Sequence, residues 1–84
     1  MKLHILARQT PAVIRAVDWS AIAPDEAKRL RALGVDDGAE VVVTHRGVFG
    51  TADPLALRLG RMTIAVRRSH ALAIEVDTVA EEAR

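Results

Sequence analysis

Residues 29–38 read RLRALGVDDG, and they connect a short amphipathic helix to a strand through two glycines and a pair of aspartates. Leu30 and Leu33 are three residues apart, so they lie on one face of the helix. Gly34 follows at the position where a left-handed residue commonly ends a helix, which would bring Val35 against Leu30 in a Schellman cap. The stretch therefore predicts a helix that stops at Leu33 and a chain that turns back over its apolar face.

Two elements are expected before this stretch. Pro24, followed by two acidic residues, suits the first turn of a helix over residues 24–33. Residues 12–19 are rich in β-branched side chains and contain no Gly or Pro, which predicts a strand. Ile14 and Val17 are three residues apart, so both face the core only if the strand contains a bulge or coils strongly.

The rest of the chain alternates strands and tight turns. Gly38 closes a turn that begins at the aspartate pair, and Pro54 fixes the start of a run with leucine at every second position. A tight connection at residues 60–61 makes this run the first half of a β-hairpin, and residues 67–70 predict one helical turn. The strands after the helix are expected at residues 39–45, 55–59, 62–66 and 72–76.

The composition describes one small domain with an aliphatic core. The chain has 84 residues, half of them hydrophobic, and its only aromatic residues are Trp19 and Phe49. We expect a single domain over residues 1–84, with a core at about 12–77 and a charged tail at 78–84. The absence of cysteine favours a reducing, cytoplasmic location, and no apolar run approaches the ~20 residues of a membrane span.

Several function classes find no support in the residues. A formal charge of +1 gives no field to attract nucleic acid, and too few aromatics are present to stack bases or to hold a proline-rich peptide. The aspartate pair before Gly38 is typical of a turn, and neither serine stands in a nucleophile motif. No spacing supplies a metal or cofactor site, so we expect solvated or capping histidines at His4, His45 and His70.

Two groups of residues are candidates for contact with a protein partner. Val48 and Phe49 lie between two glycines, where they could anchor a partner or fold back as a lid over the barrel end. The densest basic cluster suits an acidic protein surface or a solvated rim, and it consists of Arg58, Arg61, Arg67 and Arg68. No catalytic residue is assigned, and structural roles are expected for Leu30, Leu33, Gly34, Gly38 and Pro54.

About five short antiparallel strands, with one helix after the first strand, describe a small SH3-like barrel in the all-β class. The order of features resembles the ferrous-iron transport protein A (FeoA) family over roughly residues 12–77. The resemblance is carried by the helix end at Leu30, Leu33 and Gly34, by Gly38, Val41 and Val43, by Asp53-Pro54, and by Ile64, Val66, Ala71, Ile74 and Val76.

The resemblance implies a cytosolic accessory protein of bacterial ferrous-iron uptake without enzymatic activity. Its partner would be the cytoplasmic GTP-binding region of the membrane iron transporter (FeoB), with no cofactor and no insertion into the membrane. One alternative is a regulatory SH3-like domain, of the kind attached to metal-dependent transcriptional repressors, acting in trans. Metal sensing by the isolated domain is a further hypothesis, and self-association through edge strands stays open.

Overall fold

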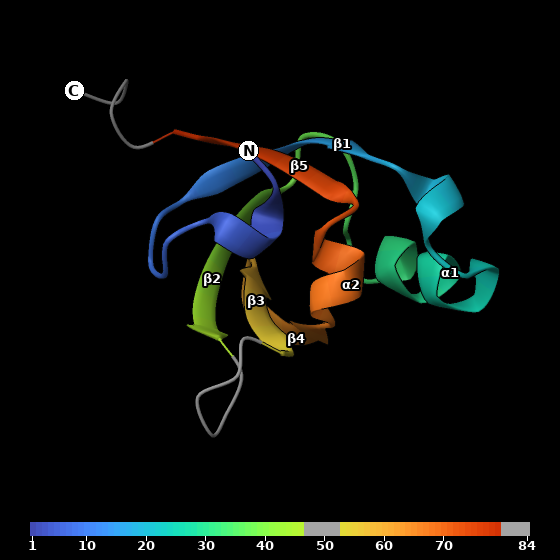
Figure 1. Cartoon of the computed structure of the whole chain (residues 1–84). Coiled ribbons are helices and arrows are strands. Elements are labelled where there is room, and N and C mark those ends of the chain that lie inside the picture. The colour runs from blue at the N-terminus through green and yellow to red at the C-terminus, as the bar shows by residue number, and fades with distance from the viewer. Residues whose placement is uncertain (47–52, 80–84) are drawn as a thin grey trace.

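Five antiparallel strands form one curved sheet in the computed structural model of the chain, which describes residues 1–46 and 53–79 (Figure 1). Their order across the sheet is β4-β3-β2-β1-β5, so that β4 and β5 occupy the two edges. This arrangement confirms the predicted all-β class with antiparallel pairing. The strands are β1 (Ala12–Val17), β2 (Glu40–Arg46), β3 (Leu55–Leu59), β4 (Met62–Val66) and β5 (Ile74–Thr78).

Helical segments connect the strands. Helix α1 (Pro24–Ala32) lies between β1 and β2 in the chain, and α2 (Arg68–Ala71) forms the single turn expected between β4 and β5. Two 3₁₀ turns, η1 (Leu3–Ile5) and η2 (Trp19–Ala21), flank β1. Trp19 was expected in the first strand, and that expectation is wrong because the strand ends at Val17 and the chain turns into η2.

The C-terminal end of α1 has the predicted cap. Gly34 adopts a φ of +105°, the Val35 N–H donates to the Leu30 carbonyl at 2.9 Å, and the Gly34 N–H donates to the Arg31 carbonyl at 3.1 Å. This hydrogen-bond pair is the Schellman motif. Leu30 and Val35 are both fully buried, and Leu33 packs against the core at its margin, so the cap fastens α1 to the sheet.

The aspartate turn is fastened to β1. The Ala39 N–H donates to the Asp36 carbonyl at 3.1 Å, and Gly38 has a φ of +88°, which explains the glycine at this position. The Gly38 N–H donates to the Ile14 carbonyl at 2.7 Å, and the Ile14 N–H donates to the Ala39 carbonyl at 2.8 Å. The turn therefore sets the position at which β2 begins beside β1.

The irregularity predicted in the first strand is present. The register between β1 and β5 shifts between Ile14 and Ala16, as in a β-bulge. Ile14 is buried and Val17 is partly buried against the core, as the sequence required. The bulge thus bends β1 so that its two ends can belong to one curved sheet.

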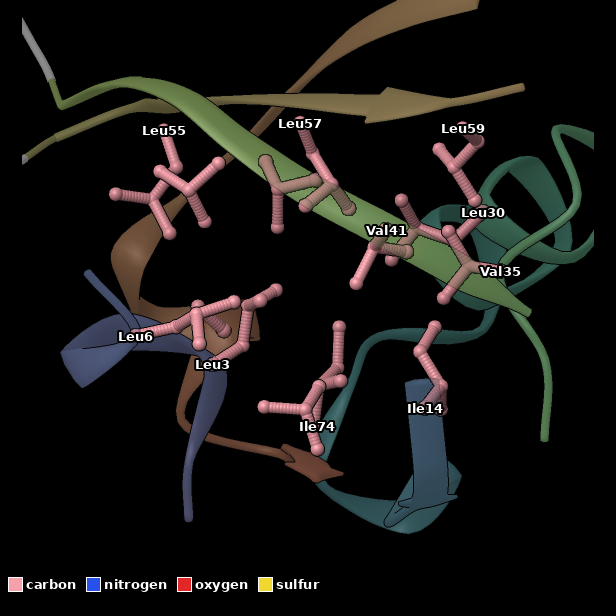
Figure 2. Packing of buried hydrophobic residues seen from close by; sticks show 14 of the residues in the cluster. Leu3, Leu6, Ile14, Leu30, Val35, Val41, Leu55, Leu57, Leu59 and Ile74 are labelled. Carbon is pink, nitrogen blue, oxygen red and sulfur yellow. The ribbon is translucent and has the colours of Figure 1, made fainter. Parts of the chain in front are cut away.

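The core is aliphatic and extends further toward the N-terminus than expected. Figure 2 shows leucine, valine and isoleucine side chains from the strands, from α1 and from the N-terminal segment pointing toward one another. Leu3 and Leu6 are 0% and 1% exposed, whereas Ile5 between them is 60% exposed. The expected start of the core at residue 12 is therefore wrong, because Leu3 of η1 and Leu6, which follows η1 directly, are both buried in it.

The predicted β-hairpin forms with Gly60 at a φ of +60° in its two-residue turn. The side chains of Leu55, Leu57 and Leu59 are buried as expected, but Met62 is 41% exposed, because it adjoins the turn at the end of the sheet. Leu72 is 44% exposed, because it caps α2 instead of beginning the last strand. The alternation of apolar residues over 62–66 and 72–76 predicts that both side chains face the core, and that prediction is wrong.

Candidate partner-binding surface

The arginines of the predicted basic cluster are all exposed, but β4 separates them into two groups. Arg58 lies on the outer face of β3, because the alternation that buries Leu57 and Leu59 turns it outward, and Arg61 occupies the β3–β4 turn. Arg67 and Arg68 follow the opposite end of β4, where α2 begins. Arg61 and Arg67 are six positions apart, roughly 20 Å along an extended chain, so the cluster is two basic patches along one hairpin.

Val48 and Phe49 lie outside the described residues. Pro54 does lie within them, after a cis peptide bond from Asp53, and it is exposed at the start of β3. Asp53 accepts a hydrogen bond from the Arg68 N–H through Oδ1 at 2.8 Å, which connects the start of β3 to the start of α2.

A polar groove of about 460 Å³ lies beside the second basic patch, between α1 and α2. Figure 1 shows the two helices next to each other, with β4 below α2. The groove brings together residues that are far apart in sequence. It is lined by Glu26, Arg29, Asp53, Pro54, Ala65, Arg67 and His70.

A bidentate ion pair holds one wall of the polar groove. The Arg29 guanidinium donates to Glu26 from Nε to Oε1 at 3.0 Å and from Nη2 to Oε2 at 2.6 Å. Nη2 also donates to the Ala65 carbonyl of β4 at 3.2 Å, so the pair joins α1 to the sheet. These hydrogen bonds hold the pKa of Glu26 below its ordinary value despite partial desolvation, with smaller contributions from the charges of Arg29, His70 and Arg67.

His70 forms the opposite wall of the groove, and its Nδ1 departs from the solvated or capping role expected from the sequence. Its side chain is only 18% exposed, and Nδ1 lies 3.7 Å from Oε2 of Glu26. That distance is beyond hydrogen-bond range, and Nδ1 is buried without a hydrogen-bond partner among the described residues, so this ring nitrogen is neither solvated nor part of a cap. Glu26 thus faces Arg29 on its own helix and His70 on α2.

An apolar depression of about 300 Å³ adjoins the polar groove on the outer face of the hairpin. His45, Ala56 and Ala65 are register partners in a row across β2, β3 and β4. The small side chains of the two alanines form part of its floor. The depression is lined by His45, Pro54, Leu55, Ala56, Thr63, Ile64 and Ala65, so that it shares Pro54 and Ala65 with the groove.

This arrangement combines charged side chains with recessed polar and apolar surface, which suits binding. Within residues 1–46 and 53–79, no group of three or more His, Cys, Asp or Glu side chains is placed to hold a metal ion. Glu26 and Asp53 both accept hydrogen bonds from the protein, which gives both carboxylates a structural role. None of the helices that the structure describes has the length and apolar character to cross a membrane.

The sequence identified only part of this surface. It singled out Arg67 and Pro54, but it assigned no role in a site to Glu26, Arg29 or His70. The three-residue spacing of Glu26 and Arg29 was a readable signal for an ion pair. The contact between Glu26 and His70 was not readable, because 44 residues separate them and only the packing of α2 beside α1 brings them together.

Comparison with known proteins decides the family. The FeoA domain matches residues 1–78, which is nearly the whole chain. The chain belongs to the FeoA family. None of the curated protein sequences matched it significantly.

Solved structures agree with this assignment. FeoA from Stenotrophomonas maltophilia, described as an SH3 domain protein complexed with zinc, is 34% identical with a TM-score of 0.72, over 92% of this chain and 89% of that one. Iron(II) transport protein A from Clostridium thermocellum is 26% identical with a TM-score of 0.79, and the present chain covers 46% of its length with 94% of its own. These likenesses confirm the SH3-like barrel predicted from the order of strands.

The fold also occurs in metal-dependent repressors. A manganese-dependent transcriptional repressor matches 94% of this FeoA-family chain with a TM-score of 0.77, but at 14% identity and over only 41% of the repressor. At that identity the likeness shows a shared barrel and no more. The FeoA family, in contrast, is one of small SH3-like proteins and is not a known enzyme family.

Proposed function

We propose that this chain is a cytoplasmic, non-enzymatic accessory protein of bacterial ferrous-iron uptake. It acts by docking on the cytoplasmic GTP-binding region of the membrane iron transporter FeoB. The observation that carries the proposal is the match of the FeoA domain over residues 1–78. The S. maltophilia relative, at 34% identity, is itself described as a candidate ferrous-iron transport activating factor.

The surface chemistry supports binding to a protein. Arg67 and Arg68 are exposed next to a groove and an apolar depression, a combination of charge and recessed apolar area that suits a protein contact. The carboxylates nearby are already hydrogen-bonded, which leaves the arginines to meet acidic groups of a partner. Val48 and Phe49 stay candidates for an apolar anchor.

A pull-down tests the proposal. The purified chain is immobilised and exposed to the purified GTP-binding region of FeoB without nucleotide, with GDP and with a GTP analogue. We expect retention in at least one of these states and its loss at high salt, because exposed charges carry part of the contact. Absence of retention in all three states would contradict the proposal.

The second candidate function is a regulatory SH3-like domain that acts in trans on a metal-dependent repressor. It is favoured only by the likeness of fold to such repressors. The same immobilised chain, exposed to a metal-loaded repressor that lacks its own SH3-like domain, distinguishes the two. We expect no retention of the repressor.

A further inference from the structure

The two edges of the sheet differ in whether another segment of the described chain pairs with them. At the β5 edge, the Val76 N–H donates to the Met1 carbonyl at 2.7 Å and Lys2 forms an isolated bridge with Glu75, so the N-terminal residues cover this edge. At the opposite edge, β4 has β3 on one side and no other strand of the described residues beyond it. An exposed strand edge is a template for pairing with another chain.

The register identifies which backbone groups of β4 face outward. Leu59 and Met62 flank the two-residue turn, so they form a hydrogen-bonded pair, and alternate pairs along the hairpin do the same. Thr63 and Ala65 belong to the other set, and their N–H and C=O groups point away from β3. The Ala65 carbonyl accepts from Arg29 Nη2 at 3.2 Å, as expected for an outward group.

Three backbone groups at this edge are therefore directed outward without a strand neighbour in the described chain: the N–H groups of Thr63 and Ala65 and the carbonyl of Thr63. The alanine-floored depression lies next to them, since Thr63 and Ala65 both line it. A strand added here would place alternate side chains over this depression. Its volume of about 300 Å³ accommodates an aliphatic side chain.

The charge around β4 indicates what kind of partner strand would bind at this edge. Segments that contact β4 carry exposed arginines at both of its ends, namely Arg58 and Arg61 at one and Arg29, Arg67 and Arg68 at the other. The two carboxylates near β4, Glu26 and Asp53, are hydrogen-bonded within the chain. Among the described residues, no ion pair engages the guanidinium groups of Arg58, Arg61 or Arg67.

The same arginines make a second copy of this chain an unfavourable partner at the β4 edge. In a symmetric antiparallel β4–β4 pair, Arg61 of one copy would approach Arg67 of the other, and like charges directly opposite each other are destabilising. An acidic strand would instead place its carboxylates beside both basic patches.

We infer that the outer edge of β4 binds an extended acidic segment of a partner protein by adding it to the sheet as an antiparallel strand. The roughly 20 Å between the two basic patches corresponds to a segment of about six residues. Backbone hydrogen bonds supply the alignment, an aliphatic side chain fills the depression, and carboxylates near the segment ends meet the arginines. The inference deepens the proposed function, and it rests on that function only in treating the chain as a protein-binding module.

Synthetic peptides test the inference independently of FeoB. The probe is acetyl-Glu-Val-Thr-Val-Glu-Glu-amide, titrated into the isotope-labelled chain at low salt and followed by NMR with amide hydrogen exchange. We expect saturable shifts along β4 and about tenfold or slower exchange of the Thr63 and Ala65 amides, because both become hydrogen-bonded. Two matched peptides serve as controls: one with every Glu replaced by Lys, and one N-methylated on alternate backbone amides.

Variants of the chain separate backbone from charge effects. Thr63→Pro removes an outward N–H and is expected to lower the affinity about tenfold, whereas Thr63→Val keeps the N–H and retains binding. If Thr63→Pro does not fold, the N-methylated peptide provides the same test from the other side. Arg61→Glu is expected to weaken binding of the acidic peptide and to strengthen binding of the lysine peptide.

Four results with the peptides would overturn the inference. They are equal binding of the acidic and lysine peptides, equal binding of the N-methylated peptide, shifts confined to residues outside β4, and absence of binding by the acidic peptide. A concentration-dependent dimer that protects Thr63 and Ala65 without peptide would also overturn it, because the occupant would then be a second copy. If the acidic peptide does not bind but the GTP-binding region of FeoB is retained in the pull-down, this binding mode is rejected and the proposed function stands.

Discussion

Gly34 is the residue on which the connection between α1 and the sheet depends. Its φ of +105° lies in a region that L side chains rarely adopt, whereas an added Cβ would lie 4.0 Å from Cδ2 of Leu59, an ordinary contact. Glycine is therefore required for its backbone conformation and not because space is lacking. A substitution here tests the Schellman cap chiefly through the backbone conformation.

Gly34→Val is expected to lower the free energy of unfolding by about 1–3 kcal/mol, because it forces a β-branched residue to a positive φ. Urea unfolding followed by circular dichroism measures this change. Gly34→Asn is the matched control and is expected to lose less, since Asn tolerates positive φ better. A valine variant that unfolds like the wild type would contradict the assigned cap.

Glu26 is the residue through which the polar groove responds to pH. Its pKa is lowered in the folded chain, chiefly by the hydrogen bonds from Arg29. Because the folded pKa lies below the unfolded one, the ionised carboxylate contributes stability at neutral pH that is lost as the pH falls through the folded pKa.

Glu26→Gln is therefore expected to cost about 0.2–0.5 kcal/mol at neutral pH, a typical value for an exposed helical ion pair. The difference from the wild type should shrink on acidification, and urea unfolding at about pH 7 and about pH 3.5 measures both values. An equal difference at the two pH values would show that the carboxylate charge contributes nothing.

At the scale of elements, the N-terminal turn η1 contributes more to the core than its length indicates. Leu3 and Leu6 are buried against the strands, while the intervening Ile5 is exposed. The apolar residues at the start of the chain were too few to distinguish a strand from a docked arm. Only the structure shows that a 3₁₀ turn presents the two leucines to one side.

Leu3→Ala is expected to destabilise the chain by about 2–5 kcal/mol, as is usual when a fully buried leucine is truncated. Ile5→Ala removes a similar side chain from the same turn, but from an exposed position, and is expected to change stability by less than about 0.5 kcal/mol. Thermal and urea unfolding of both variants provide the measurement. Similar losses of stability in the two variants would mean that η1 does not dock on the core as described.

The elements that could be predicted from the sequence are those with local causes. The end of α1 followed from Leu30 and Gly34, and the hairpin followed from alternation around Gly60. The outward side chain of Leu72 could not be predicted, because α2 continues one residue further than its pattern indicated. The groove was not predicted either, because Glu26 and His70 meet only through tertiary packing.

At the scale of the whole molecule, the barrel positions four surface features on and around one hairpin. They are two basic patches, a polar groove and an apolar depression. The core is entirely aliphatic in the described residues, and no buried polar residue occurs there. The charged and polar groups therefore lie on the surface, where the groove and the depression form one continuous outer area that a partner could contact. Membership of the FeoA family gives that surface its proposed partner.

A calorimetric titration of the chain with the cytoplasmic GTP-binding region of FeoB tests the central claim most directly. We predict saturable binding by the wild type, at least about tenfold weaker binding by the double variant Arg67→Glu, Arg68→Glu, and nearly unchanged binding by Arg15→Glu. Arg15 is the matched control, because it is an exposed arginine on β1 whose ion pair with Asp77 is long, at 3.9 Å, and solvent-exposed. Absence of heat in every nucleotide state, or full binding by the double variant, would contradict the account.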